Sequence, residues 1–173
     1  MRTLALAALI AAGLASQAAA QTPATPEIIP APGGEVIIPT PSHRKAYDAY
    51  GFAPARRAGD TLYISGVVFF RAPGEGDDVE AFKAQARRGF RQLETILKAS
   101  NASFADVVMI NSFHVWESPN FAGTRDQQFE VLKAVKDEFM PGAHPAWTAV
   151  GTSGLLAPRG IVEVQMIAHA PKR

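Results

Sequence analysis

The residue with the clearest capacity for chemistry is a carboxylate in the last apolar segment of the chain. In the segment Ile161 to Ala168, IVEVQMIA, side chains alternate between the two faces of a strand, so Glu163 and Gln165 share one face with Ile161 and Ile167. Two interpretations of Glu163 stay open. It lies on a solvated sheet face, or it lies in a cleft at a subunit boundary, where it can orient water or take a proton.

Several other chemical motifs are missing. The chain has no cysteine, and its histidines do not have the spacing of metal ligands: His43, His114, His144 and His169. Gly74-Glu75-Gly76 lacks the third glycine of a dinucleotide-binding loop, and Ser153 lacks the pattern around a hydrolase nucleophile. The sequence therefore predicts neither a metal nor a cofactor.

The amino terminus has the pattern of a cleavable signal peptide, residues 1–20. Arg2 is followed by an apolar run from Leu4 to Leu14 and by the small residues Ala18-Ala19-Ala20. The run is shorter than the roughly 20 residues that span a bilayer, and no second long apolar run follows it. We expect cleavage before Gln21, a periplasmic or secreted protein, and no membrane association after cleavage.

The charge balance weighs against nucleic acid as a partner. The chain has 17 Lys and Arg residues and 16 Asp and Glu residues, and removal of Arg2 leaves 16 of each. Nucleic-acid binding requires clustered basic surface. The roughly 150 residues that remain are the size of one ordinary domain.

A Pro-rich arm, residues 21–46, precedes the domain of residues 47–173. Because proline lacks a backbone donor, we expect much of this arm to be extended. It contains two apolar pairs, Ile28-Ile29 and Ile37-Ile38. Either one of these pairs docks on the domain, or the arm is a disordered tether.

The domain itself reads as alternating strands and amphipathic helices. Asp77 and Glu80 stand in capping-box register before the first helix, and Ser118-Pro119 is a suitable start for the second. The expected elements in order are strands 52–57 and 61–70, a helix to about 99, strand 107–116, a helix to about 140, and strands 147–151 and 161–170. This order predicts an α+β fold with one mixed sheet and two helices on a single face. The other face then needs cover, which predicts an oligomer.

Four motifs in this order resemble the Rid (reactive intermediate deaminase, YjgF-type) family between Tyr47 and Ala170. They are YGFAPA with AGDTLYISG at 50–66, QA through the helix to FADVV at 85–108, HPAWTAV at 144–150, and IVEV at 161–164. The resemblance implies chorismate-mutase-like protomers that assemble as a homotrimer, with small-molecule clefts between subunits.

The resemblance also implies which residues form the site. It assigns the water-positioning glutamate to Glu163 and the signature serine-glycine pair to Ser65 and Gly66. Where deaminating members have a carboxylate-binding arginine this chain has Trp147, and where they have tyrosine it has Phe52. Arg125 falls where relatives have asparagine, and is either a relocated clamp or an exposed helix arginine.

Loss of the arginine makes the hydrolysis of ordinary 2-imino acids unexpected. A charge-assisted hydrogen bond is worth about 1.5 kcal/mol or more, so its loss weakens binding roughly tenfold. One hypothesis is an exported hydrolase of a small apolar or aromatic imine or enamine, with Trp147 and Phe52 stacked on the substrate. A second is a non-catalytic trimeric binding or stress-protective module. A third is a ribonuclease, against which the neutral net charge weighs.

Overall fold

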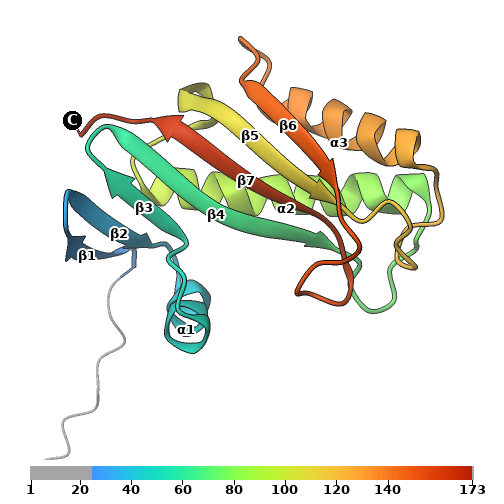
Figure 1. Ribbon diagram of the computed structural model, residues 1–173, viewed down its shortest axis with the longest axis horizontal. Helices are drawn as coiled ribbons and strands as arrows, with labels where there is room; N and C mark the ends of the chain where they lie inside the picture. Colours follow the sequence, from blue (N-terminus) through green and yellow to red (C-terminus); the bar gives the residue numbers. More distant parts are fainter. Residues whose placement is uncertain (1–24, 173) are drawn as a thin grey trace, which may run out of the picture.

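The computed structural model describes residues 25–172, which form one sheet and three α-helices (Figure 1). The strands are β1 (Glu27–Ala31), β2 (Gly34–Ile38), β3 (Ala55–Ala58), β4 (Thr61–Phe70), β5 (Val107–His114), β6 (Ala146–Gly151) and β7 (Gly160–His169). The helices are α1 (Pro41–Tyr50), α2 (Val79–Ala99) and α3 (Arg125–Phe139), with a short 3₁₀ turn at Phe104–Asp106. No helix within this range is long and apolar enough to cross a membrane.

The sheet has seven strands in the order β1-β2-β3-β4-β7-β5-β6. Every neighbouring pair is antiparallel except β5 and β6, which α3 connects as a crossover. Figure 1 shows α2 and α3 packed together against one face of the sheet. The predicted fold class, a single mixed sheet with two helices on one face, is confirmed, and the third helix α1 is an addition to it.

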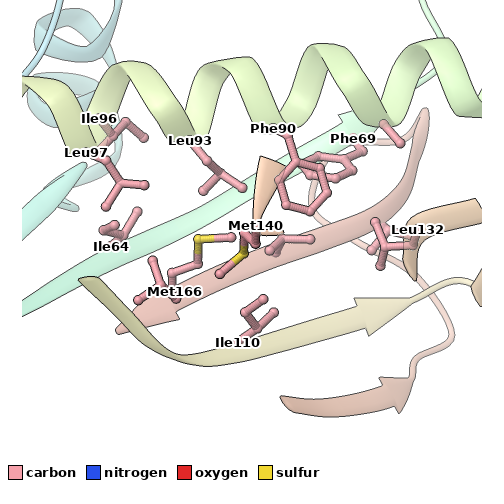
Figure 2. Packing of buried hydrophobic residues seen from close by; sticks show 14 of the residues in the cluster. Ile64, Phe69, Phe90, Leu93, Ile96, Leu97, Ile110, Leu132, Met140 and Met166 are labelled. Atoms are coloured by element: carbon pink, nitrogen blue, oxygen red, sulfur yellow. The ribbon is translucent and has the colours of Figure 1, made fainter. Parts of the chain in front are cut away.

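The core lies between α2, α3 and the sheet. The apolar stripe of α2 is buried against side chains from β4, β5 and β7, as Figure 2 shows for Leu93, Leu97, Ile64, Ile110 and Met166. On β7 the residues at even positions from Val162 to Ala168 are buried, so Glu163 and Gln165 face away from the helices. This places the chemically interesting face of β7 on the open side of the sheet.

The Pro-rich segment docks on the domain through its second apolar pair. Residues Gly34–Ile38 form β2, which pairs with β3, and the side chains of Ile37 and Ile38 are fully buried. The strands β1 and β2 form a hairpin that extends the sheet. Helix α1 then starts with Thr40 as N-cap and Pro41 in its first turn, a favourable proline position because the missing N–H has no helical partner there.

A buried arginine connects this hairpin region to the rest of the domain. The guanidinium of Arg57 donates to the carbonyl oxygens of Ser100, at the end of α2, and Ala170, after β7. It also pairs with the carboxylate of Glu35 at 3.2 Å, and Glu35 pairs with Lys172 at 2.6 Å. Three chain segments that are distant in sequence are thereby held to one side chain.

Both helix starts differ from the sequence prediction. Helix α3 begins at Arg125 because Thr124 and Gln127 form a reciprocal capping box, whereas Ser118 accepts a hydrogen bond from the Asn120 N–H within a turn. Helix α2 is capped by Asp78, which accepts from the N–H of Ala81 at 2.9 Å. A cap is decided by backbone geometry, which adjacent Asp residues or a Ser-Pro pair do not specify.

Candidate functional site

Glu163 lies at the middle of β7 on the open sheet face. Its neighbours across the strands are Val68 on β4 and Phe113 on β5. Both are apolar, and paired residues on neighbouring strands project to the same face. The Glu163 side chain is half-buried among them.

A bulge in β4 makes room for the Glu163 carboxyl group. Ile64 pairs with Met166 and Val67 pairs with Val164, so Ser65 and Gly66 together lie opposite Gln165. A Cβ atom at position 66 would lie 1.9 Å from Oε1 of Glu163 and 2.6 Å from its carboxyl carbon. The carboxyl group therefore rests against the bare Cα of Gly66, and no other residue type leaves that space.

Burial sets the electrostatics of this carboxyl group. Its pKa is raised above the ordinary value because burial disfavours the charged form, and no cation within residues 25–172 contributes to the shift. The other perturbed carboxyl groups behave in the opposite way: cationic partners lower the pKa of Glu35, Glu75, Asp137 and Glu138. A half-buried carboxyl group with a raised pKa is a candidate functional group.

Ser65, the neighbour of Gly66, fixes the segment that follows Phe52. The Ser65 hydroxyl donates to the carbonyl oxygen of Ala53 at 2.6 Å, and its backbone N–H donates to that of Pro54 at 3.0 Å. Phe52 precedes these residues directly and stacks on Tyr50 with ring centroids 6.4 Å apart. The chain therefore gathers Ser65, Gly66 and Glu163, and the hydrogen bonds of Ser65 tie the segment after Phe52 to them.

Trp147 lies on the other face of the sheet. It pairs with Ile110 of the core, and its indole N–H donates to the Ser112 hydroxyl at 2.9 Å. The ring packs on Phe129 of α3 at 5.2 Å, and the ammonium group of Lys136 lies 5.9 Å from its centroid. Within one chain, the indole expected to stack on a substrate beside Glu163 and Phe52 is instead an anchor of the helix-covered face.

The Ser112 hydroxyl belongs to a buried hydrogen-bond network that explains this orientation. Gln128 accepts from one ring nitrogen of His114 at 3.0 Å, so the other nitrogen, 2.9 Å from Ser112, accepts the hydroxyl proton. Ser112 then accepts from Trp147, and every polar group in the row has a partner. Burial lowers the pKa of His114, while its hydrogen bond to Gln128 acts in the other direction.

A groove of about 350 Å³ runs along the same edge of the molecule, between α3 and β6. It is lined by Trp116, Arg125, Asp126, Phe129, Glu130, Ala149 and Gly151. The Phe129 ring joins it to Trp147, so the predicted site residues fall into two groups. One group consists of Phe52, Ser65, Gly66 and Glu163, and the other of Trp147 and Arg125.

Within residues 25–172 there is no group of three His, Asp or Glu side chains that could hold a metal ion.

Sequence reasoning missed the partners of both groups. The role of Phe113 follows from strand pairing, and that of Trp116 and Phe129 from the packing of α3 on the edge strand. One signal was available, because Ser112 and His114 interrupt an apolar strand at period two. Two polar residues on the buried face of a strand indicate an internal network.

The comparisons with known proteins place the chain in a family. The family model described as Endoribonuclease L-PSP matches residues 43–170. YjgH, a RutC family protein of Escherichia coli K12, is 31% identical over 138 residues, which cover 79% of this chain and 95% of that protein.

Solved structures agree with this match. The structure described as protein YjgH has a TM-score of 0.57 and 33% identity, over 73% of this chain and 89% of that one. The crystal structure of Rv2704 from Mycobacterium tuberculosis, described as a member of the YjgF/YER057c/UK114 family, has a TM-score of 0.57 and 25% identity, over 73% and 92%. The chain therefore belongs to the Rid/YjgF family.

Proposed function

We propose that this protein hydrolyses a small imine or enamine that has no carboxylate, in a cleft whose acid–base group is Glu163. The observation that carries the proposal is the carboxyl group of Glu163, seated on Gly66 in an apolar setting with its pKa raised. A carboxyl group whose pKa is shifted toward neutrality is a more effective proton acceptor and donor near neutral pH.

The chemistry needs only water and one proton carrier. Glu163 accepts a proton from water as the water oxygen bonds to the imine carbon, and returns that proton to nitrogen to give a carbinolamine. The hydroxyl proton of the carbinolamine then passes through Glu163 to nitrogen as the C–N bond breaks, and a carbonyl compound and ammonia leave. An enamine takes a proton on carbon first and then follows the same course.

The environment of Trp147 supports a substrate without a carboxylate. At this position the chain has an indole whose single N–H is already bonded to Ser112. No cation lies within hydrogen-bond distance of Glu163 among residues 25–172 either, so that half of the site offers an anion no charge partner. A carboxylate would be desolvated there without compensation.

We also propose that the cleft lies between subunits of a homotrimer, as the family resemblance implies. The two groups of predicted site residues lie on different faces of one chain, and a cleft between two protomers can unite the Glu163 group of one with the groove of the other. The mature protein, by this proposal, begins at Gln21 and acts in the periplasm or the medium. The signal peptide, residues 1–20, lies outside the described residues, and the mass of the exported chain tests its removal.

The experiment compares imines with and without a carboxylate. An amine oxidase acting on benzylamine supplies an aromatic imine, and an amino-acid oxidase acting on leucine supplies a 2-imino acid, with catalase present in both. We expect the protein from Gln21 onward to accelerate ammonia release from the first imine and much less from the second. Faster hydrolysis of the 2-imino acid would contradict the argument from Trp147.

A non-catalytic, small-molecule-binding module is the second candidate. The observation that favours it is the tryptophan at position 147, where deaminating relatives have the carboxylate-binding arginine. Trp147 packs on Phe129 and bonds to Ser112, so the substrate contact is lost while the fold is kept. If the protein accelerates the hydrolysis of neither imine but still binds a ligand, the binding module is favoured over the hydrolase. RNA cleavage that disappears in a Glu163 variant would instead support the activity in the name of the family model.

A further inference from the structure

A row of four aromatic rings runs under the edge strand β6. Trp116 stacks on His114 with centroids 4.2 Å apart, His114 lies 6.1 Å from Phe129, and Phe129 lies 5.2 Å from Trp147. His114 is fully buried, whereas Trp116 and Phe129 line the groove between α3 and β6. The groove is therefore walled by two rings whose positions are fixed from behind by the row.

Gly151 and Ala149 keep this groove open on the strand side. A Cβ atom at position 151 would lie 2.3 Å from Nε1 and 2.6 Å from Cδ1 of Trp116, so this edge of the indole lies against the bare Cα at the end of β6. Ala149 adds only a methyl group to the lining. A flat ring beside a small side chain and a bare Cα provides a shelf for another planar group.

The charges around the groove favour a cation. Asp126 and Glu130 line it, and Glu117 lines the adjoining groove of about 470 Å³, which shares Trp116, Arg125 and Asp126. Among residues 25–172, Arg125 is the one cation in the two linings, and its Nε is 3.2 Å from Asp126. The start of α3 adds less attraction for an anion than an uncapped helix, because the capping box uses the N–H groups of Thr124 and Gln127 and the Asp126 carboxylate stands in the first turn.

We propose that this groove binds a planar organic cation, such as a protonated aromatic imine or amine. Aromatic rings attract a cation on their faces. The three carboxylates outnumber the single guanidinium by two, and this excess negative charge adds long-range attraction for a cation. The inference deepens the proposed function, on which it rests for the identification of the bound cation with the substrate. Binding itself is measured without turnover.

The test is a titration with three small probes, followed by the Nε1–H resonance of Trp116 in ¹⁵N-labelled protein from Gln21 onward. Benzamidinium is a planar cation, benzoate a planar anion, and cyclohexylammonium a cation that is not planar. We expect benzamidinium to shift the Trp116 signal with a Kd at least tenfold lower than either other probe. A benzoate Kd equal to or lower than that of benzamidinium would overturn the proposal.

Variants at exposed carboxylates separate the groove from general charge effects. Asp126→Asn combined with Glu130→Gln should weaken benzamidinium binding severalfold at low salt, whereas Glu94→Gln, on α2 and away from the groove, should leave it unchanged. Gly151→Val should abolish binding by crowding Trp116. Equal effects of the paired and control variants would contradict a site at this groove.

The two proposals fail in distinguishable ways. Glu163→Gln should lose turnover but still bind benzamidinium, because the rings and carboxylates that line the groove are unchanged. If benzamidinium binds but no imine is hydrolysed, the proposed function is wrong and the cation site is supported. If neutral and cationic substrates are hydrolysed equally and benzamidinium does not bind, only the cation site is wrong.

Discussion

At the scale of single residues, the contact between Glu163 and Gly66 determines what the site can do. A bulge in β4 brings a glycine opposite the carboxyl group, and the carboxyl group occupies the volume a side chain would take. The position of the proposed proton carrier thus depends on the absence of one methyl group. Precise placement matters because a displacement of about 1 Å can cost on the order of 100-fold in rate.

Gly66→Ala should therefore lower turnover by on the order of 100-fold while the protein still folds. The atom that a new Cβ meets is the end of a flexible side chain, so the Glu163 carboxyl can swing away at a modest cost in stability, about 1–3 kcal/mol. Steady-state kinetics together with denaturant unfolding measure both quantities. Unchanged kcat/KM in a folded Gly66→Ala variant would contradict the placement of the proton carrier.

The raised pKa of Glu163 predicts a specific dependence of stability on pH. The native state holds the proton more tightly than the unfolded chain, so the free energy of unfolding falls as pH rises from the ordinary pKa through the raised one. Glu163→Gln removes this loss. Its gain in stability over the unmodified protein should be present at pH 7 and smaller at pH 4, as measured by urea unfolding, and a larger gain at pH 4 would refute the shift.

At the scale of elements, β5, β6 and α3 are joined by the row from Gln128 through His114 and Ser112 to Trp147. Each member has one donor or acceptor matched to the next. Such a network is stabilising only when every group is satisfied. The indole at position 147 therefore belongs to the packing of α3 on the edge strand as much as to any ligand site.

A double-mutant cycle between Trp147→Phe and Ser112→Ala tests this coupling. Each change removes the same hydrogen bond, which is worth about 0.5–1.5 kcal/mol. The double variant should lose less stability than the sum of the single losses by about 1 kcal/mol. Strict additivity in thermal or denaturant unfolding would show that the Trp147 indole is not bonded to Ser112 in solution.

Some helices and strands of the structure could be predicted from the sequence, and others could not. The strand Thr61–Phe70 and the helix through Leu97 were predictable because their apolar periods are long and regular. Helix α1 was not, since it has no fully buried residue and its start depends on a local cap at Thr40. The start of α3 was misplaced because Ser118-Pro119 and Thr124 are both good caps, and packing decided between them.

The candidate site was predictable in part for the same reason. Period two identifies Glu163 as facing away from the apolar side of β7, and family resemblance adds Ser65 and Gly66. Neither reveals that the bulge seats the carboxyl on Gly66, or that Trp147 turns toward the helices. Both depend on the pairing of strands that are distant in the chain, β4 with β7 and β5 with β6, which no local pattern encodes.

At the scale of the whole molecule, one sheet face has no helix of residues 25–172 against it. Tyr63, Phe113 and Val150 lie on this face and remain 47%, 36% and 44% exposed in the single chain. Exposed apolar groups on a half-covered sheet indicate an interface. This is the physical argument for the proposed trimer, in addition to the family resemblance.

A charge placed on that face should break the assembly. Tyr63→Glu, on β4, should shift the protein from three times the chain mass to the single-chain mass in analytical ultracentrifugation, with its circular dichroism unchanged. Asp60→Asn, in the turn before β4, is a control that should leave the assembly intact. A single-chain mass for the unmodified protein would contradict the trimer and, with it, a cleft between subunits.

The most direct test of the account is the turnover of the benzylamine-derived imine by Glu163→Gln. Glutamine has nearly the same shape but cannot accept a proton from water. We expect the unmodified protein to accelerate ammonia release, Glu94→Gln to do so equally, and Glu163→Gln to fall to the uncatalysed rate while keeping its assembly. Full activity of Glu163→Gln would contradict the account.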